Sequence, residues 1–325
     1  MFREKLIDSL KNYFSDAIFI LAALAFYRTN DYYMGFLRQE TQSALLYLSI
    51  IYLAAALPLY LFVFRKHVSK GRLAINGIVR FAKTRHMESN EKVILLFMVV
   101  KFFYIPLMIN FVFNNAFSMD SNARNFTVQS NIENTFLSFA YPLALSLLFF
   151  IDTAFFTFGY LAEANFLKNK VRSVEPTFLG WAVALLTYPP FNSVYNQFFP
   201  WVTNDYNSFA SPELTVLLRA IVIALVVIFV WATISLGTKC SNLTNRGIVS
   251  KGAYKYVRHP AYASKNLVWW ITLLPVITFG GIFIMAAWSF LYFMRAITEE
   301  RHLSKDVDYQ KYKEKVRYMF IPKVV

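Results

Sequence analysis

Long uncharged runs alternate with short polar segments along most of the chain. The run from Ser43 to Phe64 holds 22 residues without a charged side chain. At 1.5 Å per residue, a helix of this length crosses a hydrocarbon layer of about 30 Å. The pattern therefore predicts an all-α protein that crosses the bilayer several times. Further spans are expected at Tyr13–Tyr27, Val93–Phe113, Phe136–Tyr160, Thr177–Val194 and Leu214–Leu236.

The last apolar block, from Tyr262 to Arg295, is about twice as long as one span. It carries Gly280 and Gly281 near its middle. This predicts a helical hairpin that turns at the far side of the membrane, which brings the expected number of spans to about eight. In an earlier span, Pro189 and Pro190 remove two backbone donors, so the helix must break or end there.

The first candidate span is short, and its apolar centre from Ala17 to Tyr27 follows several basic residues. A signal peptide has this pattern too. However, no small-x-small cleavage motif followed by a soluble domain comes after it. A retained helix is favoured because eight spans make the distribution of charge consistent.

Basic residues are distributed very unevenly between the expected loops. If there are eight spans, the segments on the side of the N-terminus hold 27 of the 33 Lys and Arg residues. Basic residues are retained on the cytoplasmic side during insertion, so both termini are expected in the cytoplasm. Either a bacterial inner membrane or the endoplasmic reticulum fits this arrangement. Three basic residues remain within spans, namely Lys101, Arg219 and Lys265.

Composition agrees with a membrane protein and excludes several other classes. The chain is 57% hydrophobic, with a mean hydropathy of +0.41. The net charge of +14 does not indicate nucleic-acid binding, because the basic residues flank spans, where they meet anionic lipid headgroups. Cys240 is the only cysteine, which excludes an internal disulfide and makes a packing role the favoured one. No metal is expected, because none of the histidines is spaced as a ligand: His67, His86, His259 and His302.

Polar, basic and aromatic residues become dense from Gly237 onward. One dense segment, Gly252–Tyr262, lies at the cytoplasmic mouth of the expected hairpin, and Pro260 suits the start of a helix. Past the hairpin, Arg295 and Glu299 are four residues apart on one helical face. They could pair with each other as a helix-end salt bridge, or bind opposite charges of a zwitterionic ligand. Spacing alone does not distinguish these alternatives.

These two segments together resemble the isoprenylcysteine carboxyl methyltransferases and the related phospholipid methyltransferases, over roughly residues 215 to 325. The pattern G-x-Y-x-x-x-R-H-P-x-Y is followed by R-x-x-x-E-E-x-x-L, Y-x-x-Y and a late proline. A tryptophan in the next helix is matched by Trp269 or Trp270, whereas Ser264 replaces a usual glycine. The residues that match the patterns are Gly252, Tyr254, Arg258, His259, Pro260, Tyr262, Arg295, Glu299, Glu300, Leu303, Tyr309, Tyr312 and Pro322.

The resemblance implies that S-adenosylmethionine binds between the R-H-P-x-Y segment, the hairpin and the C-terminal tail, entering from the cytoplasm. The acceptor would arrive through the bilayer. By the same resemblance, Glu299 or Glu300 binds the cofactor's amino group, and Arg295 lies near the reacting centre. Arg295 and Glu299 are the catalytic candidates. The cofactor-binding candidates are Tyr254, Tyr256, Arg258, His259, Pro260, Tyr262, Glu299 and Glu300.

Methyl transfer from a sulfonium is an in-line displacement, so such an enzyme mainly positions the reactants and excludes water. An anionic oxygen acceptor needs an arginine to orient it, whereas an amine acceptor must lose a proton, for which Glu300 or His259 is a candidate. Aromatic faces could attract the sulfonium, or they could simply form an interfacial belt. The rings concerned are Tyr254, Tyr256, Trp269 and Trp270.

The predicted function is an S-adenosylmethionine-dependent membrane methyltransferase that acts on an isoprenylcysteine-type carboxylate or a lipid headgroup. One alternative is an NADPH-dependent sterol or steroid reductase, whose C-terminal hairpin is similar. Another is a transporter in which Lys101, Asp152 and Arg219 form a polar path. We expect residues 1–176 to be an N-terminal transmembrane region of unassigned role and residues 177–325 to be the methyltransferase-like core.

Overall fold

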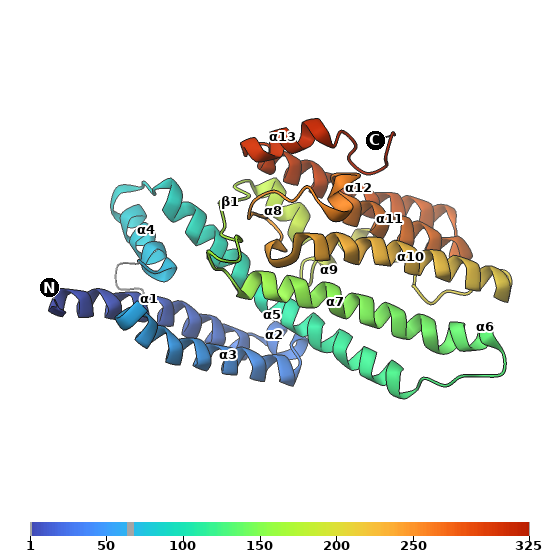
Figure 1. Ribbon diagram of the computed structural model, residues 1–325, viewed down its shortest axis with the longest axis horizontal. Helices are drawn as coiled ribbons and strands as arrows, with labels where there is room; N and C mark the ends of the chain where they lie inside the picture. Colours follow the sequence, from blue (N-terminus) through green and yellow to red (C-terminus); the bar gives the residue numbers. More distant parts are fainter. Residues whose placement is uncertain (1, 64–67, 325) are drawn as a thin grey trace. The chain divides into compact units, whose positions relative to one another are not determined.

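The computed structural model describes residues 2–63 and 68–324 and is almost entirely helical (Figure 1). This confirms the expected all-α polytopic bundle, while the number of crossings stays a prediction. Phe64, the expected end of the second span, and His67 lie outside the described residues. Within them, six helices are long and apolar enough to cross a membrane: Glu4–Thr29, Gln39–Val63, Ser89–Arg124, Ile132–Leu161, Pro212–Lys239 and Phe279–Leu303.

The chain divides into two compact units, Met1–Phe113 and Asn114–Val325. The functional division expected after residue 176 stays a prediction, although residues 114–176 pack within the second unit. The helices of the first unit are α1 (Phe2–Thr29), α2 (Asp31–Phe36), α3 (Gln39–Pro58), its π-helical continuation η1 (Leu59–Val63), α4 (Lys70–Thr84) and the first part of α5 (Ser89–Arg124).

A buried carboxylate connects α1 to three other elements of the first unit. Asp16 of α1 accepts hydrogen bonds from the hydroxyls of Tyr52 in α3 and Tyr60 in η1, at 2.9 and 2.5 Å. It also accepts one from the backbone amide of Gly71, at 2.9 Å, in the first turn of α4. Helix N-termini favour negative charge, so Asp16 has a structural reason to be buried here.

The second unit contains the remaining elements. Helix α10 packs against both α7 and α11, while α12 packs against α11 and α8. Two short strands pair antiparallel, with Ser173 opposite Asn245. The elements are α6 (Ile132–Thr135), η2 (Phe136–Ala140), α7 (Tyr141–Leu161), β1 (Ser173–Val174), α8 (Phe178–Leu185), α9 (Asn192–Phe198), α10 (Pro212–Leu236), η3 (Gly237–Lys239), β2 (Thr244–Asn245), η4 (Gly252–Lys255), α11 (Pro260–Leu273), η5 (Leu274–Val276), α12 (Phe279–Leu303) and α13 (Val307–Lys315).

The predicted hairpin is present as α11 and α12, but its turn differs from the expected one. The chain turns at residues 274–278, and Gly280 and Gly281 lie in the first turn of α12. Thr278 caps this helix, because its hydroxyl accepts a hydrogen bond from the Gly281 amide at 3.0 Å. The turn precedes the glycines because Pro275 limits helical hydrogen bonding after α11 and Thr278 starts a new helix.

The expected span Thr177–Val194 is not one continuous helix, and the break lies where its two prolines predicted a break or an end. The structure has two short helices, α8 and α9, separated by residues 186–191. Pro189 and Pro190 lie in this interruption, as expected from their missing backbone donors. The break is therefore in the middle of the segment rather than at its end.

The broken segment runs antiparallel to α12. Thr177, before α8, accepts a hydrogen bond from Arg301 near the end of α12, whereas Tyr195 of α9 donates one to the carbonyl of Ala287, 14 residues earlier in α12. Irregular backbone at membrane depth requires surrounding protein to satisfy its polar groups. The interruption between α8 and α9 thus brings polar groups beside the interior of α12.

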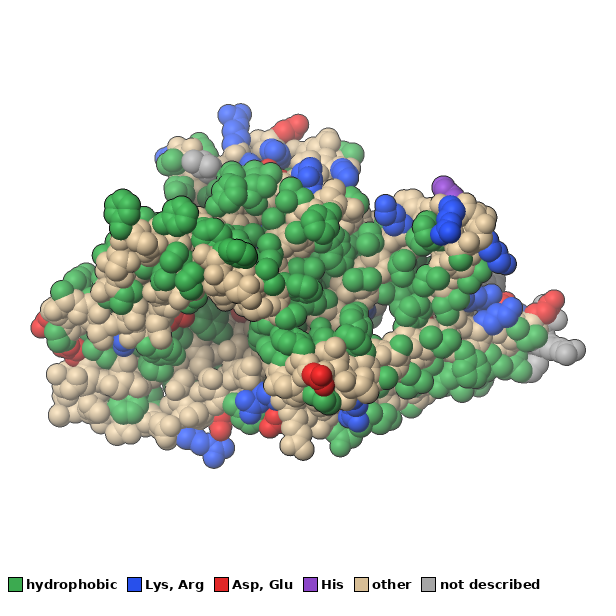
Figure 2. All heavy atoms as spheres, turned by 180° about the vertical axis from the view of Figure 1, so that it is seen from behind, with side chains coloured by type: hydrophobic (Ala, Val, Ile, Leu, Met, Phe, Trp, Pro, Cys, Tyr) green, Lys and Arg blue, Asp and Glu red, His purple; other side chains and the backbone are tan. Residues whose placement is uncertain are grey.

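Large apolar side chains cover much of the visible surface (Figure 2). On α12, Phe283 and Phe290 are 67% and 62% exposed, and on α3 Ile51 is 64% exposed. Exposed apolar surface on this scale is unfavourable in water but is expected where helices face lipid. The outward faces of these helices therefore support a membrane location.

Candidate functional site

An ion pair between Arg258 and Glu300 connects the two sequence motifs. The Nε atom of Arg258 donates to Oε1 of Glu300 at 2.5 Å. Both side chains are more than nine-tenths buried. A buried ion pair is favourable only when its remaining hydrogen-bonding groups also have partners. The C-terminal tail supplies those partners for Arg258.

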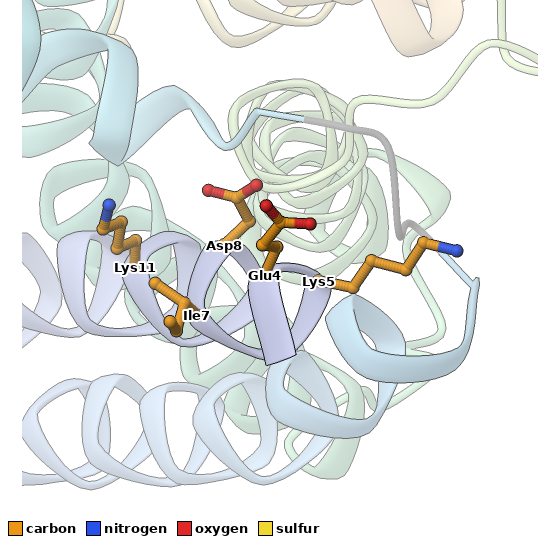
Figure 3. Close-up of a pocket in the computed structure, with 5 residues that line it drawn as sticks. All are labelled: Glu4, Lys5, Ile7, Asp8 and Lys11. Atoms are coloured by element: carbon orange, nitrogen blue, oxygen red, sulfur yellow. The ribbon is translucent and has the colours of Figure 1, made fainter. Parts of the chain in front are cut away.

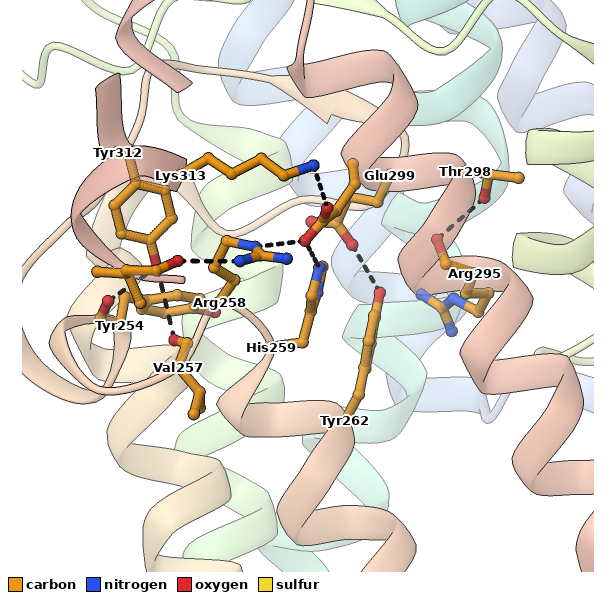
Figure 4. Close-up of polar contacts among 12 residues, drawn as sticks. Tyr254, Val257, Arg258, His259, Tyr262, Arg295, Thr298, Glu299, Tyr312 and Lys313 are labelled. Carbon is orange, nitrogen blue, oxygen red and sulfur yellow. Dashed lines mark hydrogen bonds and ion pairs between the residues drawn. The ribbon is translucent and has the colours of Figure 1, made fainter. Parts of the chain in front are cut away.

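The C-terminal tail folds back over the R-H-P segment (Figure 4). The Nη1 atom of Arg258 donates to the carbonyls of Val316 and Arg317, at 2.9 and 2.5 Å. The backbone amides of Arg258 and His259 donate to the carbonyls of Tyr318 and Met319, at 3.0 and 2.8 Å. The tail is thus held by both side-chain and backbone bonds.

Glu300 is the centre of this network. Its Oε1 lies 3.4 Å from Nε2 of His259, and its Oε2 lies 3.2 Å from Nζ of Lys313 in α13. Together with Arg258, these groups surround the carboxylate with basic side chains. Glu300 therefore has a structural role, holding α11, α12 and α13 together.

Glu299 has a different environment from its neighbour. Its side chain is exposed, and its Oε2 accepts a hydrogen bond from the Tyr262 hydroxyl at 2.9 Å. The ring of Tyr262 stacks on that of His259, with centroids 5.4 Å apart and planes 5° apart. Of the two adjacent carboxylates, Glu299 is the one available to a ligand.

Arg295 lies one turn deeper in α12 and is 6% exposed. Its Nη1 donates to the Thr187 hydroxyl at 2.6 Å, and its Nη2 donates to Oδ1 of Asn242 at 3.0 Å. The guanidinium also lies 5.3 to 5.6 Å from three tyrosine ring centres. The break after α8 supplies Thr187, so the interrupted helix directly shapes this part of the site. The three rings are Tyr188, Tyr262 and Tyr292.

The remaining predicted site residues do not all lie in the polar network. The carbonyl of Tyr254 accepts a hydrogen bond from the Tyr312 hydroxyl at 2.8 Å, which fixes the G-x-Y segment to α13. Pro260 begins α11 as expected. Tyr256, in contrast, is 57% exposed and faces Trp231 of α10, with ring centroids 6.0 Å apart. The structure does not bring Tyr256 into the polar network.

The tryptophans of α11 occupy two different environments. Trp269 packs against the Trp201 and Tyr292 rings, with centroids 4.9 and 4.8 Å apart. Trp270 donates through its Nε1 to the Ser289 hydroxyl at 3.0 Å. Of the two, only Trp269 contacts a ring that also lies beside Arg295, namely that of Tyr292.

Ser264 does not disturb the helix in which a glycine was expected. It is buried, and its hydroxyl donates to the carbonyl of Pro260 at 2.9 Å. A serine bonded to its own helix in this way needs no further partner.

A second buried polar group was not anticipated from the sequence. Glu175, which follows β1, is 2% exposed and accepts hydrogen bonds from the Thr177 amide at 3.0 Å and from Arg301 at 3.2 Å. His302 lies beside it and shares a 2.8 Å hydrogen bond with Ser173. Glu175 has no motif around it, so only the folding of α8 against α12 reveals this group.

The charges within other spans have structural partners. Asp152 of α7 accepts a 2.5 Å hydrogen bond from Thr233 of α10. Arg219 donates to the carbonyls of Leu137 and Tyr206, at 3.2 and 2.6 Å. Asp152 and Arg219 thus bind different groups in the second unit, which does not favour a shared polar path through it.

Cys240 and the described histidines do not indicate nucleophilic or metal chemistry. Cys240 is fully buried, and burial raises the pKa of its thiol. Its Sγ donates to the carbonyl of Thr233 at 3.2 Å. Among residues 2–63 and 68–324, no three His, Cys, Asp or Glu side chains are grouped so that they could hold a metal ion.

A hollow on the first unit is separate from these groups (Figure 3). Its lining residues all come from the first three turns of α1. Two carboxylates and two lysines alternate there, and one of the carboxylates, Asp8, pairs with Arg72 at 3.0 Å. These are the properties of a solvated helix surface. The lining residues are Glu4, Lys5, Ile7, Asp8 and Lys11.

The apolar outward faces of the helical bundle indicate an integral membrane protein. A buried ionic network joins its last hairpin to the C-terminal tail and forms a candidate ligand site there. The sequence model of the phospholipid methyltransferase family matches residues 212–310. This confirms the expected similarity for that segment, which includes both motifs, and it supports a membrane methyltransferase that acts on lipid-type substrates. Comparison with curated proteins gives no match, and comparison with solved structures gives none.

Proposed function

We propose that the protein transfers a methyl group from S-adenosylmethionine to a lipophilic acceptor. The observation that carries the proposal is the exposed carboxylate of Glu299 beside the stacked rings of His259 and Tyr262. These groups lie in the segment that matches the family model. The neighbouring Arg258–Glu300 pair is neutralised internally, so it can hold the site without binding the ligand itself.

The residues present suit this cofactor. Its α-amino group is cationic, and Glu299 offers an anionic oxygen outside the buried network. The cofactor's adenine is flat and aromatic, and the rings of His259, Tyr262 and Phe320 form an aromatic wall close to that carboxylate. The tail bonded to Arg258 covers the same region and helps to exclude water.

When bound, S-adenosylmethionine supplies a methyl carbon whose bond to sulfur breaks as the bond to the acceptor forms, with the electron pair remaining on sulfur. Arg295 is placed to orient an acceptor oxygen, one turn deeper in α12 than Glu299. Thr187 and Asn242 hold its guanidinium. Fixing the acceptor in this way lowers the entropic barrier to an in-line displacement.

The acceptor is proposed to enter from the bilayer and the cofactor from the cytoplasm. The concentration of basic residues on one side supports cytoplasmic termini. Both an isoprenylcysteine-type carboxylate and a lipid headgroup fit the family similarity. A bacterial inner membrane and the endoplasmic reticulum both suit this arrangement.

Calorimetric titration of the detergent-purified protein with S-adenosylhomocysteine, and separately with NADPH, tests the cofactor before any acceptor is known. We expect saturable binding of S-adenosylhomocysteine alone. Glu299→Ala should weaken it roughly 10- to 100-fold, because a charged hydrogen bond is lost. Glu314→Ala, which removes an exposed glutamate of α13, is the matched control and should bind normally.

Binding of NADPH alone would replace the proposal with a reductase. Binding of neither, together with substrate flux in liposomes without a methyl donor, would favour a transporter. Normal affinity in Glu299→Ala would show that the amino group is bound elsewhere.

A further inference from the structure

Lys265 of α11 has a position that the proposed cofactor site does not explain. Its Nζ lies 5.4 Å from the ring centre of Trp269, 5.4 Å from that of Tyr292 in α12 and 5.8 Å from that of Phe229 in α10. The ammonium is therefore enclosed by three helices. The residue as a whole is mostly, but not fully, buried.

The charge of Lys265 is only partly compensated by the protein. Among the described residues, no carboxylate lies within ion-pair distance of its Nζ. Aromatic faces attract a cation, but they replace only part of the hydration that an ammonium loses on leaving water. The Tyr292 hydroxyl hydrogen-bonds the ammonium but is neutral, and Asp152 and Asp205 attract it only from beyond ion-pair distance. A charged residue at this depth, without a close counter-ion, marks a ligand path in a membrane protein.

A second cation lies against the same aromatic ring. The guanidinium of Arg295 is 5.3 Å from the ring centre of Tyr292, which Lys265 also faces. The described hydrogen bonds of Arg295 go to two neutral oxygens, those of Thr187 and Asn242. The two positive charges thus approach the same ring, beside the interruption that separates α8 from α9.

The position of this pair also places it on the bilayer side of the cofactor residues. Lys265 is one turn deeper in α11 than Tyr262, and Arg295 is one turn deeper in α12 than Glu299. A group that arrives from the lipid would meet these cations before it meets Glu299.

We infer that Lys265 and Arg295 together bind an anionic oxygen group of the lipid acceptor, either a carboxylate or a phosphate. An anion there supplies the close counter-charge that the ammonium lacks, beside the ring that both cations approach. That the bound lipid is the methyl acceptor rests on the proposed function, whereas the binding of an anionic lipid does not. It assigns to Lys265 a part in acceptor recognition that the two sequence motifs do not contain.

The test measures the binding of single-chain probes to the full-length protein in neutral detergent. The anionic probes are palmitate and hexadecyl phosphate; the comparison probes are hexadecanol, hexadecylamine and inorganic phosphate. We expect the two anionic chains to bind at least about 10-fold more tightly than every comparison probe, because only they combine an anion with an apolar chain. Equal binding of the neutral and anionic chains would overturn the inference. Equal binding of inorganic phosphate and hexadecyl phosphate would overturn the assignment to a lipid.

Variants then assign the effect to Lys265. Lys265→Met keeps the length of the side chain without its charge and should lose at least about 10-fold in affinity for the anionic chains, whereas Lys265→Arg should restore most of it. Asp152→Asn should bind the probes normally. If Asp152→Asn loses as much affinity as Lys265→Met, the lysine serves as the partner of that carboxylate and the inference is wrong.

S-Adenosylhomocysteine binding separates this inference from the proposed function. Lys265→Met should leave that affinity unchanged, because no described contact joins Lys265 to Glu299. If the wild-type protein binds anionic chains selectively but does not bind S-adenosylhomocysteine, the proposed function fails and the anionic lipid site stands. The opposite result rejects only the lipid site.

Discussion

Arg258 and Arg295 are almost equally buried, at 8% and 6% exposure, but they have different partners. The hydrogen bonds of Arg258 go to the Glu300 carboxylate and to two carbonyls of the C-terminal tail. Those described for Arg295 go to a hydroxyl and an amide oxygen, within a group of tyrosine rings. The carboxylate partner of Arg258 makes that arginine part of the fold's ionic network, whereas the neutral oxygens that hold Arg295 fix the orientation of its guanidinium.

Removing the first arginine should give the largest effect on stability. Arg258→Ala leaves the Glu300 carboxylate buried without its closest cation and releases the tail, so we expect a loss of about 3 to 5 kcal/mol in the free energy of unfolding. Thermal unfolding in detergent measures it. Lys313→Met is the matched control, because this half-exposed lysine contacts the same carboxylate; it should cost less than about 1 kcal/mol. A small effect in both variants would contradict a structural role for Glu300.

A second, smaller effect should appear in turnover rather than in stability. Thr187→Val removes one hydrogen bond from Arg295 while keeping the shape of the side chain. We expect kcat to fall about 10-fold, equivalent to about 1.4 kcal/mol, because the guanidinium is less firmly oriented. The affinity for S-adenosylhomocysteine should not change. Ser193→Ala, in the same broken segment, is the control, because the described hydrogen bond of its hydroxyl goes to the Pro190 carbonyl and not to Arg295. A change in cofactor affinity without a change in kcat would argue against this positioning role.

The smallest expected effect concerns pH and the N-terminus of α13. Burial raises the pKa of Asp306, but hydrogen bonds from Asn245 and Arg172 more than offset this, so its pKa lies below the usual value. A lowered pKa contributes stability that is complete above the unfolded value of about 4 and is lost as the pH falls through the folded value. Asp306→Asn should therefore unfold at a lower temperature than the wild type at pH 6.

The difference between Asp306→Asn and the wild type should narrow as the pH falls below about 4, because the wild-type carboxylate is then protonated as well. Thermal unfolding at several pH values measures this. Asp308→Asn, which loses a more exposed contact to the same arginine, should show a weaker pH dependence. A difference that stays constant from pH 6 to pH 3 would show that Asp306 acts only as a helix cap.

Much of the helical architecture follows from local patterns. The run Ser43–Phe64 predicted a span because length and polarity alone decide whether a helix can cross hydrocarbon. The block Tyr262–Arg295 predicted a hairpin for the same reason. The detail of its turn depended on Pro275 and Thr278 rather than on the glycines. Local composition thus predicts the helical type of these segments better than their ends.

The candidate site was predictable only in part. Fixed spacing placed Arg295 and Glu299 on one helical face, and the R-H-P-x-Y pattern placed His259 and Tyr262 at the start of α11. The difference between Glu299 and Glu300 was not predictable, because adjacent residues point in directions about 100° apart on a helix and only the neighbouring elements decide which is buried. Tyr256 matched a dense aromatic segment but faces α10 instead.

By itself, the sequence determined that this is a helical membrane protein with a methyltransferase-like C-terminal hairpin, because span length, charge asymmetry and motif spacing are properties of neighbouring residues. The tertiary structure alone decided which charges neutralise each other. The tail closes over Arg258, the break after α8 supplies Thr187 to Arg295, and Lys265 meets the same ring as Arg295. The contacts of Arg258 with Val316, of Thr187 with Arg295 and of Lys265 with Tyr292 join residues 58, 108 and 27 positions apart, so no local pattern contains them.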